Sequence, residues 1–302
     1  MSLYLDYRPK TWDEIVGNEE TVSSLQNMLK KGNPPHTYLF VGGSGCGKTT
    51  IARILATDLG CNGNDYREIN AADFRGIDSV REIIQSAKYK PLEGKSKVYM
   101  IDECHKLTTD AQNAMLKILE DTPDHVYFIL ATTDPQKLIA TVKSRAVQYA
   151  MNPLSDMEMI RLLKTTIKKE NESVEKEVIE QIIQDSLGHP RAALNILEKV
   201  LNTEPEERLE AAKAMAEQTN ESIELCRCLL SNTGWKKCST ILQGLKGQEA
   251  EGIRRVILGY CQSVLLKADN ERAAMVIEQF MEPLYDVGFP GLVFNCYAIC
   301  KS

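Results

Sequence analysis

The sequence predicts an α/β fold in which a parallel β-sheet covered by helices comes first and an all-helical region follows. Two observations lead to this prediction. In the first half of the 302-residue chain, short apolar runs of β type alternate with stretches of helical periodicity, as in a parallel sheet covered on both faces. Beyond Asn152-Pro153-Leu154 the chain has helical periodicity with short breaks, and we expect no strand there.

Five strands are expected in the first half, most of them at short apolar runs. They cover residues 37–41, 67–70, 97–101, 126–130 and 146–149. Helices are expected between them, near residues 19–31, 48–59, 77–88 and 109–120. The second of these helices has a single apolar stripe that must be buried, formed by Ile51, Ile54, Leu55 and Leu59.

The second half begins with a helix-start signal. Ser155 followed by Glu158 is a capping box, and Pro190 suits the first turn of a later helix because its missing N–H is not needed there. From about residue 205 to residue 300 we expect five or six amphipathic helices. Three domains are therefore predicted, over residues 1–152, 153–203 and 204–302.

Composition excludes several classes of protein. Hydrophobic residues make up 43% and charged residues 26%, so disorder, a collagen-like repeat and a coiled-coil rod are poor descriptions. The sequence contains no apolar stretch near the ~18 residues that cross a bilayer, and its start lacks the basic and apolar segments of a signal peptide. We expect a cytoplasmic protein without a membrane partner. The nine cysteines contain no Cys-x-x-Cys and the four histidines are isolated in sequence, so we interpret the cysteines as small core residues.

The charge is unevenly distributed. The formal net charge is −6, from 36 basic and 42 acidic residues, which argues against a protein that coats nucleic acid through bulk positive charge. Residues 1–150 carry 18 basic and 19 acidic groups, whereas residues 151–302 carry 18 and 23. The N-terminal half could therefore still present a local basic surface.

A phosphate-binding segment joins the first predicted strand to a predicted helix. From Gly42 to Thr49 it fits G-x-x-x-x-G-K-[ST] in full. Its glycines let backbone N–H groups turn toward phosphates, Lys48 would reach the β- and γ-phosphates, and the Thr49 hydroxyl would bind Mg²⁺. The predicted nucleotide-binding residues of this P-loop are Gly42, Gly43, Ser44, Gly45, Cys46, Gly47, Lys48, Thr49 and Thr50.

Two carboxylates follow the third predicted strand. Asp102 would hold Mg²⁺, usually through water, and Glu103 would act as general base on the attacking water. They come 54 residues after Lys48 (102 − 48), and the combination predicts an NTP-hydrolysing site. The P-loop alone also allows a small-molecule kinase, but the carboxylate pair favours water as the nucleophile.

The motifs together closely resemble the AAA+ ATPase subunits of sliding-clamp loaders, the bacterial DNA polymerase III gamma/tau subunit most of all. The resemblance rests on residues 102–105, 128–138 and 144–145. Three further segments also resemble replication factor C small subunits: residues 7–12, 15–18 and 69–78. The match covers about residues 4–200. It implies that the three predicted domains are an AAA+ nucleotide-binding domain, a helical lid and a helical collar for oligomerisation.

The resemblance implies further site residues. Thr133 falls where a polar sensor contacts the γ-phosphate or its water, Arg145 where an arginine finger enters the neighbouring subunit's site, and Arg191 where a lid arginine reads the γ-phosphate. The adenine would be enclosed by Tyr7, Arg8, Pro9, Val16 and Gly17. These residues, together with the lack of an Asn-Lys-x-Asp sequence, imply ATP rather than GTP.

The sequence departs from the bacterial pattern in two places. Bacterial gamma/tau subunits carry a four-cysteine zinc module after the P-loop helix, where this chain has only Cys61 and the short segment 62–65, so we expect no zinc. The arginine-finger motif usually continues with cysteine, but Ala146 follows Arg145, whose predicted role is unchanged. This mixture is compatible with a bacterial, archaeal or phage-encoded protein.

The implied partners are a sliding clamp, primer–template DNA and other clamp-loader subunits in a ring or spiral, at least one of them non-identical. DNA would be held through its backbone by Arg75, Thr108 and Thr109. ATP binding would drive clamp opening and DNA binding, and hydrolysis would release the closed clamp on DNA.

Two alternatives are a non-hydrolysing structural subunit of the same complex and another AAA+ motor, such as a branch-migration or remodelling ATPase. The intact Lys48, Asp102, Glu103 and Arg145 argue against the first. The match over residues 132–138 and the all-helical collar argue against the second.

Overall fold

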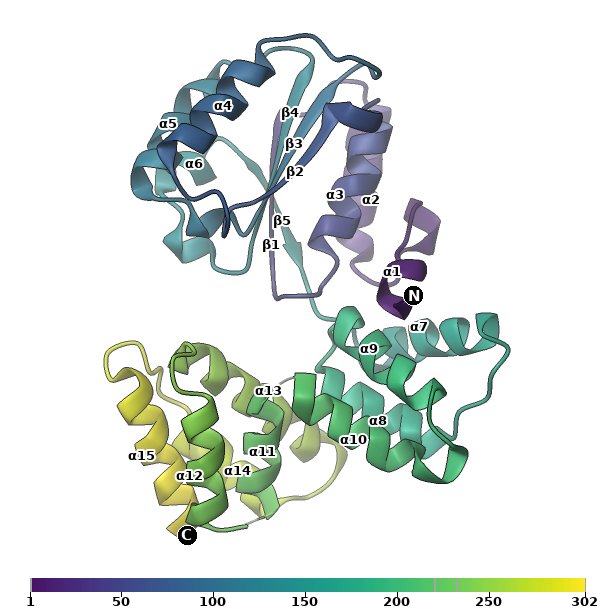
Figure 1. The fold of residues 1–302 in the computed structure, drawn as a ribbon, viewed down its shortest axis with the longest axis vertical. Helices are drawn as coiled ribbons and strands as arrows, with labels where there is room; N and C mark the ends of the chain where they lie inside the picture. The colour runs from purple at the N-terminus through teal and green to yellow at the C-terminus, as the bar shows by residue number, and fades with distance from the viewer. Residues whose placement is uncertain (1, 220, 232, 302) are drawn as a thin grey trace. The chain divides into compact units, whose positions relative to one another are not determined.

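The structure, a computed structural model, describes residues 2–219, 221–231 and 233–301. The chain divides into two compact units (Figure 1). The sheet unit comprises Leu5–Glu158, and the helical unit comprises Met1–Tyr4 with Met159–Ser302. The three predicted domains, with boundaries at residues 152 and 203, remain a prediction.

The sheet unit contains the predicted parallel sheet. Its five strands lie in the order β2-β3-β4-β1-β5, and every pairing is parallel. The strands are β1 (Thr37–Gly42), β2 (Tyr66–Asn70), β3 (Lys97–Asp102), β4 (Val126–Thr132) and β5 (Val147–Met151). Because β4 lies between β1 and β3, the strand order reverses beside β1, and ligands of such sheets bind at the carboxyl edge near this point.

Helices cover both faces of the sheet, with α4, α5 and α6 on one face and α2 and α3 on the other (Figure 1). Their bounds are α2 (Glu19–Lys30), α3 (Lys48–Asp58), α4 (Ile77–Ala87), α5 (Thr109–Glu120) and α6 (Ala140–Lys143), after a short α1 (Leu3–Asp6). Adjacent strand residues point to opposite faces: Leu39 packs into the core beneath α4 and α5, whereas Tyr38 and Phe40 pack into the core beneath α3. Covering both faces explains why the three inner strands, β1, β3 and β4, are apolar over most of their length.

The helical unit follows β5. Its helices are α7 (Asp156–Lys169), α8 (Lys176–Ser186), α9 (Pro190–Leu201), α10 (Arg208–Thr219), α11 (Glu221–Ser231), α12 (Trp235–Gly244), α13 (Ala250–Lys267), α14 (Glu271–Gln279) and α15 (Gly288–Lys301). The capping box before α7 is confirmed, since the backbone N–H and the hydroxyl of Ser155 both donate to Glu158 Oε2 at 2.7 Å. Within the described residues, no helix is both long and apolar enough to span a membrane.

A buried charge cluster ties α13 to the segment between α14 and α15. Both carboxylate oxygens of Glu251 accept hydrogen bonds from Arg254, each at 2.8 Å, and Oε2 also accepts the backbone N–H of Leu284 at 2.9 Å. Arg254 also donates to the carbonyl oxygen of Phe280 at 2.7 Å. These contacts, with Arg254 as the largest cause, lower the pKa of Glu251 to about 2.

We predict that Glu251→Ala lowers the free energy of unfolding by about 3–5 kcal/mol, because it leaves the Arg254 guanidinium buried without its carboxylate. Glu251→Gln should cost less, since its amide oxygen can still accept a hydrogen bond. Urea unfolding would measure both losses. The matched control is Glu278→Ala, which removes an exposed glutamate from α14 and should change stability by about 0.5 kcal/mol or less.

The same contacts give a pH dependence with a defined sign. The pKa of Glu251 is lower in the folded chain than its ordinary value of 4.5, so the ionised carboxylate favours the folded state. Its contribution is fully present above pH 4.5 and decreases as the pH falls toward 2. Glu251→Gln should therefore remove part of the acid sensitivity of unfolding. If the free energy of unfolding of Glu251→Gln falls as steeply below pH 4.5 as that of wild type, Glu251 is not the source of this pH dependence.

Candidate nucleotide site

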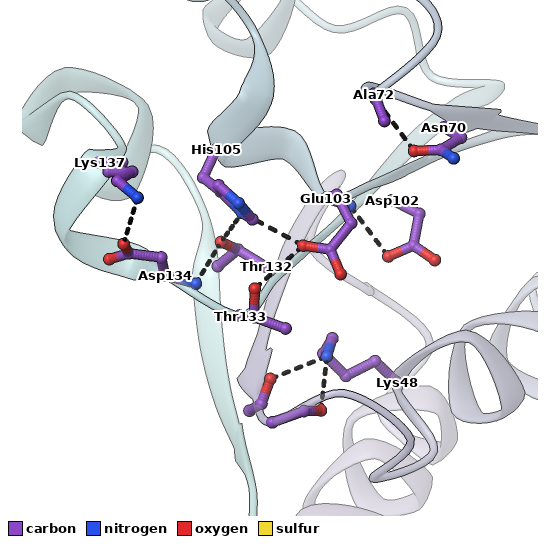
Figure 2. A network of polar contacts seen from close by, with 12 residues as sticks. Lys48, Asn70, Ala72, Asp102, Glu103, His105, Thr132, Thr133, Asp134 and Lys137 are labelled. Carbon is purple, nitrogen blue, oxygen red and sulfur yellow. Dashed lines mark hydrogen bonds and ion pairs between the residues drawn. The ribbon is translucent and has the colours of Figure 1, made fainter. Parts of the chain in front are cut away.

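The P-loop lies between β1 and α3 at the carboxyl edge of the sheet. Gly45 and Gly47 have φ angles of +76° and +96°, a left-handed conformation that favours glycine. Lys48 is the first residue of α3 and is 6% exposed. Its Nζ donates to the carbonyl oxygens of Gly42 and Gly43, both at 2.8 Å (Figure 2). The amine is thus held across the start of the loop, next to the N-terminus of α3, where backbone N–H groups favour an anion.

Other P-loop residues have structural reasons for their identity. A Cβ on Gly42 would lie 2.3 Å from the carbonyl oxygen of Met151, so the pairing of β1 with β5 requires glycine there. Cys46 is buried, and burial raises the pKa of its thiol, which lowers the thiolate fraction at neutral pH. Ser44 is exposed and Thr50 is half-buried.

The predicted Mg²⁺ ligands are brought together from two elements. Thr49, at the start of α3, donates its hydroxyl hydrogen to Asp102 Oδ2 at the end of β3, over 3.2 Å. A hydroxyl and a carboxylate side by side are hard oxygen donors of the kind that bind Mg²⁺ together with phosphate and water, so the donor set fits this ion. In the described part of the chain, no group of three or more His, Cys, Asp or Glu residues is placed to hold a metal ion.

Glu103 has an unusual backbone conformation. Its φ and ψ are 50° and 40°, in the left-handed region, which costs of the order of 1–3 kcal/mol for a residue other than glycine. Its backbone N–H donates to Asp102 Oδ1 at 2.9 Å, and its Oε2 accepts the hydroxyl hydrogen of Thr133 at 3.0 Å. The predicted base and the predicted sensor are therefore in direct contact (Figure 2).

The structure adds His105, which the sequence analysis did not select. His105 Nδ1 lies 3.0 Å from Thr132 Oγ1 and 3.3 Å from Glu103 Oε2. Thr132 Oγ1 also accepts the backbone N–H of Asp134 at 3.0 Å, and Asp134 forms an ion pair with Lys137 at 3.1 Å (Figure 2). The signal in the sequence was a histidine two positions after Glu103 and a threonine directly before Thr133.

Asp102 and Glu103 line an open groove that runs along α3 and β2. Its other lining residues include Arg53, Thr57, Asn62, Tyr66, Glu68 and Asn70. Arg53 and Glu68 form an ion pair at 2.8 Å. The groove leaves the two carboxylates accessible from one side, as a base that acts on water requires.

Comparisons with known proteins identify the family. A family model described as "DNA polymerase III, delta subunit" matches residues 17–73 and 62–155. The DNA polymerase III subunit gamma/tau of Mycobacterium tuberculosis is 36% identical over 224 residues, which are 67% of this chain and 39% of that protein. The chain belongs to the clamp-loader AAA+ family. The subunit tau of Escherichia coli is 36% identical over 65% of this chain, and the subunit gamma of Buchnera aphidicola is 34% identical over the same share.

The clamp-loader relatives are longer than the region they share with this chain. The matched region spans 39% of the Mycobacterium protein, 34% of the Escherichia coli protein and 60% of the Buchnera protein. Solved structures of Thermotoga maritima RuvB are also similar. One variant has a TM-score of 0.65 at 20% identity and covers 86% of this chain and 91% of its own. Another, described as a Holliday junction branch migration motor, has a TM-score of 0.60 at 22% identity over 78% and 85%. At this identity the similarity shows the fold alone.

In this member of the family, Arg145 contacts two helices of its own sheet unit, α5 and α6. Its guanidinium donates to Glu120 Oε2, at the end of α5, and to the carbonyl oxygen of Thr141 in α6, both at 3.0 Å. The Arg145 side chain is 29% exposed and Glu120 is 63% exposed. The guanidinium is therefore held at a surface of the sheet unit.

The predicted DNA-contacting residues meet at one place. The backbone N–H of Thr108 donates to the carbonyl oxygen of Arg75 at 3.1 Å, which joins the segment before α4 to the start of α5. Thr108 caps α5 by accepting the N–H of Ala111 at 3.2 Å. Arg75, Thr108 and Thr109 are all exposed. This gives a surface with an arginine and the N-terminus of a helix, both of which suit phosphate oxygens.

The remaining predicted residues lie in two places. Arg191 is the second residue of α9 in the helical unit, where its guanidinium lies 5.8 Å from the centre of the Tyr4 ring. The predicted adenine-enclosing residues lie in the sheet unit, with Tyr7, Arg8, Pro9 and Val16 half-buried and Gly17 buried. A Cβ on Gly17 would lie 2.5 Å from the side chain of Leu154, and its φ of +74° also favours glycine. The roles of these residues remain predictions.

Proposed function

We propose that the chain is an ATP-hydrolysing subunit of a DNA sliding-clamp loader, acting in the cytoplasm. The observation that carries the proposal is the meeting of Lys48, the Thr49–Asp102 pair and the Glu103–Thr133 pair at one edge of the sheet. Relatives named as DNA polymerase III gamma and tau subunits support the clamp-loader assignment.

In the proposed reaction, the P-loop binds the phosphates of ATP and the Lys48 amine turns from the carbonyl oxygens of Gly42 and Gly43 to the β- and γ-phosphates. Thr49 and Asp102 would hold Mg²⁺, which when bound neutralises charge on the phosphate oxygens. Glu103 accepts a proton from water as the water oxygen attacks the γ-phosphorus. The bond from that phosphorus to the bridging oxygen breaks, and ADP and phosphate leave. Thr133 orients the water or the γ-phosphate.

The remaining predicted residues would make hydrolysis depend on a neighbouring subunit and on DNA. Arg145 would enter the site of a neighbouring subunit, and Arg191 would contact the γ-phosphate bound in its own subunit. Arg75, Thr108 and Thr109 would follow the DNA backbone without reading bases. ATP binding would then favour an open clamp and bound primer–template DNA, and hydrolysis would release the closed clamp. We propose ATP rather than GTP as substrate, and no zinc in the segment around Cys61.

The test is steady-state ATP hydrolysis by the purified chain at several protein concentrations, with and without primed DNA and a sliding clamp from the same source. We expect turnover per subunit to rise with concentration and with DNA, and to rise further with the clamp. ATP binding without turnover under every condition would instead favour a non-hydrolysing structural subunit. Stimulation by DNA with no effect of the clamp would favour another AAA+ motor.

A further inference from the structure

The imidazole of His105 joins the ends of two neighbouring strands at the site. Its Nδ1 lies 3.3 Å from Oε2 of Glu103, which follows β3, and 3.0 Å from Oγ1 of Thr132, the last residue of β4. The His105 side chain is only 10% exposed, and Thr132 is fully buried. The ring is therefore fixed between the two strand ends (Figure 2).

The hydrogen-bond partners determine which ring nitrogen carries the proton. An ionised Glu103 carboxylate can only accept hydrogen bonds, so an Nδ1 without hydrogen would turn its single lone pair toward a lone pair of the carboxylate, which is repulsive. Nδ1–H instead donates to Thr132 Oγ1 at 3.0 Å, and Glu103 Oε2 lies on the same side of the ring, 3.3 Å from Nδ1. Burial lowers the pKa of His105, although the carboxylates of Glu103 and Asp134 oppose this effect, so the ring is a neutral donor at pH 7.

Glu103 Oε2 thus has two polar neighbours in different directions. It accepts a hydrogen bond from the hydroxyl of Thr133 at 3.0 Å, and His105 Nδ1 lies 3.3 Å away. Under the proposed function, on which this argument rests, Thr133 turns to the γ-phosphate or to the water when ATP binds. The contact from His105 does not depend on that movement, because the ring is anchored on Thr132.

We propose that His105 is the positioning residue for Glu103 during ATP hydrolysis. Its Nδ1–H holds Oε2 while Thr133 contacts the nucleotide, so that the other oxygen, Oε1, keeps its direction toward the attacking water. A base that must reach water at hydrogen-bond distance loses efficiency when its carboxylate rotates freely. Glu103 has three rotatable side-chain bonds, and a fixed neighbour 3.3 Å from Oε2 restricts their rotation.

The test compares kcat and KM for ATP in the assembled complex for wild type, His105→Ala, His105→Asn and Thr132→Val. We expect His105→Ala to lower kcat about 10- to 100-fold while KM and the Kd for ATP stay within about twofold. His105→Asn should recover most of the loss, because its amide N–H can donate in the same direction. Thr132→Val, which removes the anchor of the ring, should lower kcat in the same way. The matched control is His125→Ala, since His125 contacts the backbone carbonyl of Tyr89 instead of the site.

Several outcomes would overturn the proposal. The first is that His105→Ala has a kcat within twofold of wild type. The second is that His105→Asn is as slow as His105→Ala. The third is that KM changes while kcat does not. If His105→Ala does not fold, His105→Asn and Thr132→Val decide by the same kcat criterion. Wild-type protein without turnover would contradict the proposed hydrolysis itself, whereas active wild type with an unaffected His105→Ala variant would contradict only the positioning role.

Discussion

Replacing Glu103 by glutamine should lower ATP turnover about 100- to 10,000-fold. The amide cannot accept a proton from water, but it keeps the size of the side chain, and its oxygen can still accept the hydrogen bond from Thr133. Lys48, Thr49 and Asp102 are unchanged by this substitution, so ATP binding should persist. The variant should therefore bind ATP, and in the assembled complex it should accumulate the ATP-bound state.

Turnover and the Kd for ATP, measured on the same preparation, test this prediction. The matched control is Glu68→Gln, which makes the same substitution in the same groove at a residue paired with Arg53. It should retain turnover within about threefold of wild type, as expected for a surface ion pair of small energetic value. Glu103→Gln protein that turns over ATP at more than a tenth of the wild-type rate would show that another group is the base.

The positions of the strands could be predicted from the sequence, because the pattern that indicates a strand lies within the strand's own residues. An apolar run such as Thr37 to Val41 must be buried on both faces, and this pattern predicts a central parallel strand without knowledge of its partners. The P-loop and the Asp102–Glu103 pair are likewise contiguous motifs. All five strands and the four named helices lie within two residues of their predicted bounds.

The contacts around Glu103 could not be predicted because they depend on strand register. The pairing of β3 with β4 brings Thr132 and Thr133 beside residues 103 and 105, which are about 30 positions away in sequence. A one-residue change of register would turn these side chains to the other face of the sheet. The left-handed backbone of Glu103, which directs its side chain, is also not encoded by a glycine or asparagine signal.

The contacts of the segment after Cys61, where the family's zinc module would lie, also could not be predicted from the sequence. Sequence comparison with the family indicates only that cysteines are missing between Cys61 and Asp65. In the structure the buried carboxylate of Asp65 accepts three backbone N–H groups, from Leu92, Glu93 and Gly94, at 2.7–2.8 Å. Burial opposes ionisation, but these N–H groups hold the pKa of Asp65 below its ordinary value. A carboxylate thus connects two loops of the sheet unit at this position.

If Arg145 is an arginine finger, as proposed, its replacement by alanine should lower ATP turnover in the assembled complex about 1,000- to 100,000-fold without weakening ATP binding. The guanidinium would neutralise charge that develops on the transferring phosphoryl group of the neighbouring subunit. In the isolated chain it is paired with Glu120, which is 63% exposed. Such a surface pair contributes about 0–1 kcal/mol, so little opposes its transfer to the neighbouring site. Arg81→Ala, which removes an exposed arginine paired with Asp78, is the matched control.

A mixing experiment separates action in trans from a structural effect. Arg145→Ala chains keep an intact P-loop, and Lys48→Ala chains keep an intact Arg145, so each variant alone should be inactive. When the two are assembled together, a site with Lys48 can lie next to a neighbour with Arg145, and turnover should return to part of the wild-type level. If Arg145 acted within its own subunit, no combination of these chains would hold both residues at one site, and the mixture would stay inactive. Recovery on mixing therefore requires that the arginine cross a subunit interface, which makes hydrolysis dependent on assembly.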